Sequence, residues 1–307
     1  MFSGASNFAD SVDSVFLFIF TVSFIFLFGL TGIMVWFAVK YNRKRHPQAV
    51  QIKDNMKLEL AWTIIPLILV LFMFYYGYMA FAPTRVVPKD AMPVRVTGQM
   101  WSWSFEYPNG KKTTELRLPL NKPVKLLLYS PDVIHSFYIP AFRIKEDMVP
   151  GKENYMWFVP TIEGTYEILC AEYCGLSHAF MEAKVVVVQD TSFNRWLNEV
   201  VPMTAQELGL TILQNNACTG CHSLDGKPLI GPSFKGLFGS KRVVVVNGKE
   251  TTVVADSAYI KRAILEPNQE VVKGFKPEIM RSYKDVLKAN DIKSIVDYLE
   301  QDSKAKN

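Results

Sequence analysis

Two long apolar runs near the N-terminus constrain this chain more than any other feature. They span Val15–Val39 and Leu58–Ala82, within a chain that is 49% hydrophobic and 13% aromatic. Each run exceeds the ~20 residues that an α-helix needs to cross the hydrocarbon core of a bilayer. We therefore predict two transmembrane helices, at about residues 15–39 and 58–82.

Charges beside the first run predict whether it is cleaved as a signal peptide and how it is oriented in the membrane. The residues before it include Asp10 and Asp13 but no Lys or Arg, whereas a cleavable signal peptide begins with a basic segment. We therefore expect a retained helix. The segment between the two runs carries Lys40, Arg43, Lys44, Arg45, Lys53 and Lys57. The positive-inside rule places this loop in the cytoplasm and both termini outside.

The formal net charge of +5 comes largely from that loop, and the C-terminal half mixes Lys with Asp and Glu. It holds no basic arm or stripe of the kind that marks a nucleic-acid-binding protein. We therefore exclude nucleic acid as a partner.

After the second run the sequence changes to short alternating stretches. In Trp101–Tyr107 every second residue is apolar, and the turn sequence Pro108-Asn109-Gly110 follows. Further strands are predicted at Thr114–Leu118, Val124–Tyr129, Tyr155–Val159, Tyr166–Cys170 and Ala183–Val188. This spacing predicts a small antiparallel sandwich or barrel over about residues 92–190.

The remaining sequence has a helical period. Helices are predicted at Thr191–Val200, at Thr204–Gln214 and at Ala289–Gln301. The second begins with a capping box, Thr204 and Glu207. The predicted division is a segment 1–91 with the two membrane helices, a β-domain 92–190, a linker helix 191–202 and a mainly α domain 203–307.

Cys218-Thr219-Gly220-Cys221-His222 matches the attachment motif of haem c, in which two thiols bind the vinyl groups and the imidazole binds the iron. A zinc half-site would need further Cys or His nearby, and a thioredoxin-like pair would need a βαβ context. Met is the usual second axial ligand. We predict Met280, which lies in a Gly- and Pro-containing loop, rather than Met203; the alternative is that Met280 fills the domain core.

A second group of ligating residues is formed by Cys170, Cys174, His178 and Met181, with His135 at a distance. The two Cys alone would predict a disulfide in an exported domain. The nearby imidazole and thioether instead favour copper, which prefers such soft ligands. Two thiolates exceed the need of a single blue-copper ion, which indicates two copper ions bridged by sulfur.

This pattern, behind a two-helix anchor, resembles cytochrome c oxidase subunit II with its dinuclear CuA centre, in the caa-type version with a fused cytochrome c. The resemblance implies a multi-domain membrane protein: a transmembrane hairpin, a cupredoxin-like β-sandwich and an all-α class I cytochrome c domain. It also implies the copper ligands: Cys170 and Cys174 bridge, His135 and His178 bind one copper each, Met181 binds weakly, and Glu172 binds through its carbonyl. The Glu172 side chain would reach a Mg²⁺ ion shared with subunit I.

Two further roles are implied by the resemblance. Trp101 matches the aromatic stretch through which electrons reach the copper centre; its alternative role is packing in the sandwich core. Glu59 matches a Glu at the cytoplasmic mouth of a proton channel into subunit I. Its alternative is an acidic residue favoured by the dipole at a helix N-terminus.

The implied function is to receive electrons in a respiratory haem–copper oxidase. Electrons pass from an external donor, a cytochrome or a quinol-oxidising complex, through haem c and CuA to subunit I, which reduces oxygen to water and translocates protons. No catalytic residue is expected in this chain, because it lacks a cluster of intramembrane histidines. The expected location is a bacterial inner membrane among lipid and other oxidase subunits, with the redox domains on the periplasmic side. Rival functions are a subunit of a nitric oxide reductase, a copper-delivery or thiol–disulfide protein, and a free-standing tethered electron carrier.

Overall fold

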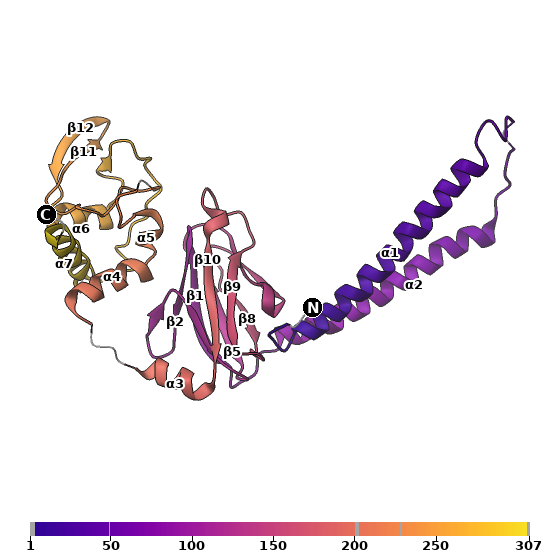
Figure 1. Cartoon of the computed structure of the whole chain (residues 1–307), viewed down its shortest axis with the longest axis horizontal. Coiled ribbons are helices and arrows are strands. Elements are labelled where there is room, and N and C mark those ends of the chain that lie inside the picture. Colours follow the sequence, from indigo (N-terminus) through magenta and orange to yellow (C-terminus); the bar gives the residue numbers. More distant parts are fainter. Residues whose placement is uncertain (1–3, 49, 200–202, 228, 306–307) are drawn as a thin grey trace.

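The structure is a computed structural model that describes residues 4–48, 50–199, 203–227 and 229–305. Figure 1 shows three parts in chain order: a long helical hairpin, a β-sandwich and a C-terminal domain built mainly of helices. Residues 200–202, where the predicted linker helix would end, lie outside the described residues.

The hairpin consists of α1 (Ala9–Lys40) and α2 (Met56–Phe81), and the short 3-10 helix η1 (Ala82–Arg85) follows it. Both long helices are apolar enough to cross a membrane, with mean hydropathies of 2.4 and 2.1 and no buried residue in their most apolar stretch. Helix α2 begins where the Asn55 side chain accepts a hydrogen bond from the Leu58 amide, as N-cap residues do. The two predicted spans therefore correspond to these two helices.

The sandwich contains two five-stranded sheets, with the orders β3-β2-β1-β5-β8 and β4-β10-β9-β6-β7. Their strands are β1 (Met92–Gln99), β2 (Ser102–Glu106), β3 (Lys112–Thr113), β4 (Leu116–Pro119), β5 (Val124–Tyr129), β6 (His135–Ile139), β7 (Ile144–Met148), β8 (Asn154–Phe158), β9 (Gly164–Cys170) and β10 (Glu182–Val188).

The predicted sandwich is confirmed, but its purely antiparallel character is wrong. Strand β1 pairs with β5 in parallel, and β4 pairs with β10 in parallel. The physical reason is the path of the chain. After β3 it crosses to the second sheet as β4 and then returns to the first sheet as β5, which lies beside β1 and runs in the same direction.

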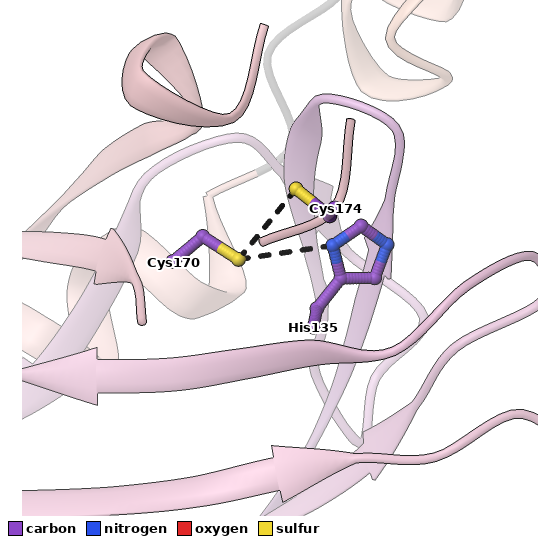
Figure 2. Close-up of side chains that lie close together, drawn as sticks. All are labelled: His135, Cys170 and Cys174. Carbon is purple, nitrogen blue, oxygen red and sulfur yellow. Dashed lines mark hydrogen bonds between the residues drawn. The ribbon is translucent and has the colours of Figure 1, made fainter. Parts of the chain in front are cut away.

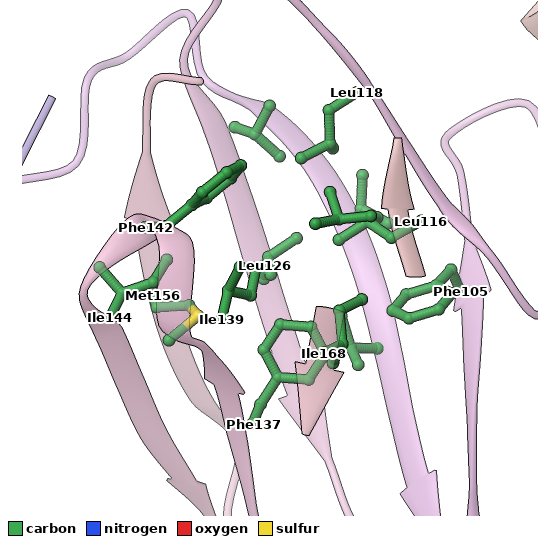
Figure 3. Packing of buried hydrophobic residues seen from close by; sticks show 14 of the residues in the cluster. Phe105, Leu116, Leu118, Leu126, Phe137, Ile139, Phe142, Ile144, Met156 and Ile168 are labelled. Atoms are coloured by element: carbon green, nitrogen blue, oxygen red, sulfur yellow. The ribbon is translucent and has the colours of Figure 1, made fainter. Parts of the chain in front are cut away.

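The core lies between the two sheets. Along β5 the burial alternates, and Val124, Leu126 and Leu128 are fully buried, as expected for a strand with one face in a core. Figure 3 shows Phe105 and Phe137 packing between the sheets with aliphatic side chains from neighbouring strands. This rigid framework holds the ends of β6 and β9.

The N-terminal segment attaches the membrane hairpin to the sandwich. The Ser6 hydroxyl donates to the Phe142 carbonyl at 2.7 Å, and the Val159 amide donates to the Asn7 side chain at 2.7 Å. Arg143 forms an ion pair with Asp13 of α1 at 2.8 Å. The sandwich is therefore held at one end of the hairpin, beside the ends of the two apolar spans.

The C-terminal part follows α3 (Asp190–Asn198) and contains α4 (Ala205–Asn215), α5 (Cys218–Cys221), α6 (Ser257–Leu265) and α7 (Ala289–Ala305). The predicted capping box of Thr204 and Glu207 is confirmed at the start of α4. Helices α4 and α7 approach closely at Gly209, where a Cβ atom would lie 2.3 Å from the Ser294 carbonyl oxygen.

This domain is not all-α, which corrects the expectation. It contains a three-stranded sheet of β11 (Lys241–Val246), β12 (Lys249–Val254) and β13 (Val271–Val272), in the order β12-β11-β13. The reason is local. A run of β-branched Val residues favours a strand, and Asn247 and Gly248 both adopt positive φ, as a tight hairpin turn requires.

Candidate metal centre

One end of the sandwich brings the predicted copper ligands together. His135 begins β6 and Cys170 ends β9, and these strands are neighbours in the sheet. The loop after β9 contains Cys174 and the short 3-10 helix η3 (His178–Phe180) and returns as β10. Because β9 and β10 pair, the Cys170 amide donates to the Met181 carbonyl at 3.2 Å, and both ends of the loop lie at one point.

The donor atoms converge on each other. The Cys170 Sγ lies 3.8 Å from both the Cys174 Sγ and the His135 Nδ1 (Figure 2). The Cys174 Sγ lies 3.5 Å from the His178 Nδ1 and 3.6 Å from the Met181 Sδ. The Glu172 carbonyl oxygen lies 3.2 Å from the Cys170 Sγ, whereas the Glu172 residue itself is exposed.

These distances bear on the two alternatives for the cysteine pair. A disulfide has an S–S length of about 2.05 Å, and both thiols are free in the structure. The two imidazoles and the thioether each contact one of the two thiols, and this donor set selects a soft metal such as copper. The residues present therefore fit a thiolate-bridged copper site.

The two thiols differ in ionisation. Burial by itself raises the pKa of Cys170, but hydrogen bonds, first among them that from His135, outweigh it and lower this pKa to about 6. Burial and the negative charge of Cys170 raise the pKa of Cys174 to about 12. In the absence of a cation, one thiolate thus keeps the other thiol protonated, and a bound cation favours ionisation of both.

Asp132 orients His135, a role that the sequence prediction missed. Its Oδ1 lies 2.9 Å from the His135 Nε2, and its Oδ2 accepts the Met100 amide at 2.7 Å. Burial opposes both charges. It is outweighed by their hydrogen bond together with those from the Met100 and Val133 amides to Asp132 and between His135 and Cys170, so the pKa of Asp132 is lowered and that of His135 is raised. Nε2 donates to Asp132, while Nδ1 faces the Cys170 Sγ at 3.8 Å, where a metal can replace the hydrogen bond between them. The sequence did contain a signal for this role, because Asp132 stands three residues before the predicted ligand His135.

Two tryptophans form hydrogen bonds to the loop that contains Cys174. Trp103 lies in β2, and Trp101 directly precedes that strand. The Trp101 indole N–H donates to the Cys174 carbonyl at 3.2 Å, and the Trp103 indole N–H donates to the Met181 carbonyl at 3.4 Å. Trp103 is buried in the core, whereas Trp101 is half-buried against it. Gly175 adopts a φ of +116°, and a Cβ atom there would lie 3.2 Å from the Trp101 ring. The sequence prediction singled out Trp101 and missed the contact of Trp103.

A second candidate site lies in the C-terminal domain. Cys218 and Cys221 form the ends of α5, and His222 follows. The His222 Nδ1 donates to the Pro232 carbonyl at 2.7 Å, and its ring stacks on Phe234 with centroids 4.6 Å apart. Burial lowers the pKa of His222. The ring is therefore neutral and presents its Nε2 as a ligand.

These three side chains line a cavity with about 1530 Å³ of space between atoms, its open mouth included. Met280 lines the same cavity, whereas Met203 is exposed and is outside it. Most of the other lining is apolar, from residues such as Leu213, Phe234, Ile260, Leu287 and Leu299. Two thiols, a neutral imidazole and a thioether around an apolar cavity fit a thioether-linked haem.

Glu59 lies apart from both sites. It stands in the first turn of α2, after the N-cap Asn55, where a negative charge stabilises the helix N-terminus. That position is common to both of its predicted roles, so the role in proton transfer stays a prediction.

Family models match the membrane hairpin and most of the sandwich. The family models for cytochrome c oxidase subunit II match residues 1–78 (transmembrane domain) and residues 111–190 (periplasmic domain). Cytochrome c oxidase subunit 2 of Alkalihalophilus pseudofirmus is 32% identical over 222 residues, which are 67% of this chain and 65%, just under two thirds, of that protein. The alternative cytochrome c oxidase subunit 2 of Bradyrhizobium diazoefficiens is 32% identical over 227 residues, 64% of this chain and 82% of that protein.

A solved structure is also similar. The periplasmic domain of subunit II of the cytochrome oxidase of Bradyrhizobium japonicum is 35% identical, with a TM-score of 0.35, over 36% of this chain and 94% of that chain.

Proposed function

Because the chain belongs to the cytochrome c oxidase subunit II family, we propose that it receives electrons for a haem–copper oxidase and passes them to the catalytic subunit I. The observation that carries this proposal is the convergence of two thiols, two imidazoles and a thioether at one end of the sandwich. No part of this proposal requires the chain itself to bind oxygen.

In the proposed copper centre, the thiolates of Cys170 and Cys174 and the imidazoles of His135 and His178 would hold the copper ions. Met181 and the Glu172 carbonyl would be further ligands. A copper pair supplies one-electron transfer with a fixed ligand set. The chain contributes rigidity: Trp101 and Trp103 fix the loop backbone, and Asp132 fixes the His135 ring. The exposed Glu172 carboxylate is proposed to reach a Mg²⁺ ion at the boundary with subunit I.

The C-terminal domain is proposed to be a fused cytochrome c, as in caa-type oxidases. Cys218 and Cys221 would form the thioether bonds, and His222 and Met280 would be the axial ligands. The apolar cavity that these residues line supports the proposal. Fusion to the copper domain raises the effective concentration of this donor above that of a diffusing protein.

The hairpin is proposed to anchor the chain in a bacterial plasma membrane with the sandwich and the C-terminal domain outside. The basic loop between α1 and α2 supports this orientation. Partners would then be subunit I, other oxidase subunits, lipid and an external electron donor. Glu59 at the cytoplasmic end of α2 is proposed to lie at the mouth of a proton channel.

Optical and paramagnetic resonance spectra of the purified complex, oxidised and reduced, test this function. We expect a c-type haem band and a mixed-valence dicopper signal that Met181→Leu alters. Met156→Leu is the matched control, because Met156 is buried in the sandwich core and a Met-to-Leu exchange there preserves volume. A copper-replete wild type without the signal, with Cys170 and Cys174 joined as a disulfide, would refute the proposal.

A further inference from the structure

Gln99 connects the sandwich to the C-terminal domain. It is the last residue of β1, and its side-chain amide donates a hydrogen bond to the Asn216 carbonyl at 3.0 Å. A Gln is usually exposed, yet only 7% of the Gln99 surface is accessible. Asn216 is the C-cap residue of α4 and stands two residues before Cys218. This partly buried polar contact therefore lies beside the proposed haem attachment.

Further contacts continue the interface around it. The Asn215 side chain donates to the Lys112 carbonyl of β3 at 3.2 Å. Gln99, Met100 and Asp132 of the sandwich line the same cavity as Cys218. In Figure 1 the C-terminal domain lies beside the sandwich. The sandwich thus forms part of the wall of the proposed haem cavity.

The contact completes a bonded route between the two candidate sites. From Cys218 the backbone leads through one residue to the Asn216 carbonyl, and the hydrogen bond crosses to Gln99. Two residues further along the chain, the Trp101 indole donates to the Cys174 carbonyl at 3.2 Å. Electrons tunnel farther through covalent and hydrogen bonds than through space. The route therefore joins a haem-binding cysteine to a copper-binding cysteine.

A branch of the same route reaches His135. The Met100 amide, next to Gln99, donates to Asp132 at 2.7 Å, and Asp132 in turn contacts the His135 ring at 2.9 Å. The sandwich side of the interface is thus connected by hydrogen bonds to the candidate copper ligand His135.

We propose that Gln99 is a positioning residue that docks the C-terminal domain on the copper loop through Asn216, and so sets the rate of electron transfer between the two centres. This inference rests on the proposed function. In each event one electron leaves ferrous haem iron, which becomes ferric, and the oxidised, mixed-valence copper pair takes it up. No proton or further reductant is required.

Four variants of the full chain, purified within its complex, test the docking. Gln99→Leu removes the hydrogen bond, and Gln99→Glu places a carboxylate against the Asn216 carbonyl. Asn215→Ala removes the second contact without changing β1. Gln214→Leu is the matched control, because Gln214 is exposed on the same helix α4.

Two readouts are needed. Hydrogen exchange of the amides at 99–101 and 216–218 reports docking, and photoreduction of the haem followed by optical detection of both centres reports the transfer rate. One lost hydrogen bond between neutral groups predicts a docking ratio lower by about two- to tenfold. We therefore expect weaker protection and slower transfer in Gln99→Leu, a larger effect in Gln99→Glu, and unchanged haem and copper spectra.

The outcomes separate the two proposals. If both Gln99 variants and Asn215→Ala match Gln214→Leu in protection and rate, the docking role is wrong, while the proposed function stands. If the wild type lacks either centre, the proposed function fails, and the docking role fails with it. Slower transfer with altered spectra in Gln99→Leu would assign Gln99 to the folding of the sites, against the docking role, with Asn215→Ala as the independent check.

Discussion

Replacing Asp132 by Asn tests whether this buried carboxylate orients His135 for metal binding. Asp132 accepts hydrogen bonds on both oxygens: Oδ1 faces the His135 Nε2 at 2.9 Å, and Oδ2 faces the Met100 amide at 2.7 Å. An amide has only one acceptor oxygen, so Asp132→Asn leaves one of these two donors facing an NH₂ group. The substitution keeps the size of the side chain and removes its charge.

The magnitude follows from the position of Asp132 behind a candidate ligand. His135 is fully buried, so water cannot replace the negative charge that the substitution removes from beside it. Removing the partner of a metal-binding His typically lowers metal affinity by about 10–100-fold. At about 1.4 kcal/mol for each factor of ten, the expected loss of copper-binding free energy is about 1.4–2.8 kcal/mol.

A competition titration of the copper-loaded chain against a chelator of known affinity measures this loss, and paramagnetic resonance reports the change at the centre. Asp147→Asn is the control, since Asp147 lies in the adjacent strand β7 and contacts Ser136 and Lys145 instead of His135. An Asp132→Asn protein that folds normally and binds copper within about twofold of the wild type would refute the orienting role.

Three further predictions concern packing and pH. Gly231→Ala places a Cβ atom 2.5 Å from the His222 ring, so we expect a smaller low-spin haem fraction in the optical spectrum. Gly220→Ala is the control: its Cβ atom would meet nothing within 4 Å, so we expect the low-spin fraction to stay unchanged. Phe137→Ala empties a fully buried site in the sandwich core and should lower the free energy of unfolding by about 3–5 kcal/mol in a denaturant titration. Burial raises the pKa of Tyr283 to about 12, so its contribution to stability is complete below about pH 10, the ordinary Tyr pKa, and is lost as the pH rises further. Tyr283→Phe should remove this part of the alkaline decline in urea stability; an unchanged decline would contradict it.

Local sequence was sufficient to predict an element where the neighbouring residues in the chain decide its secondary structure. The runs around Phe24 and Phe72 predicted two helices, because twenty apolar residues in succession have few other environments. The capping box at Thr204 is likewise a contact within one turn, and the structure has it. The Val run of β11 with Asn247-Gly248 carried an equally local hairpin signal that the sequence prediction missed.

The candidate ligands show the same distinction. Cys170, Cys174, His178 and Met181 stand within twelve residues, so their residue types and spacing alone indicated a soft-metal site. The distant His135 was grouped with them from the sequence as one remote imidazole, but its spacing did not indicate how it would come to lie beside them. The pairing of β6 with β9 places it beside Cys170.

Residue types and spacing were enough to indicate two candidate membrane spans, a donor set of thiols and imidazoles, and a motif that matches haem attachment. Tertiary structure alone decided which distant residues serve that chemistry. Two contacts join segments far apart in the chain: the Trp103 indole donates to the Met181 carbonyl, and the Gln99 side chain donates to the Asn216 carbonyl. Asp132 is near His135 in the chain, but it also accepts from the distant Met100 amide. Their geometry depends on how the two sheets pack and where the C-terminal domain docks. Such long-range contacts leave no periodicity or spacing in the sequence, because they are fixed only when the whole core has formed.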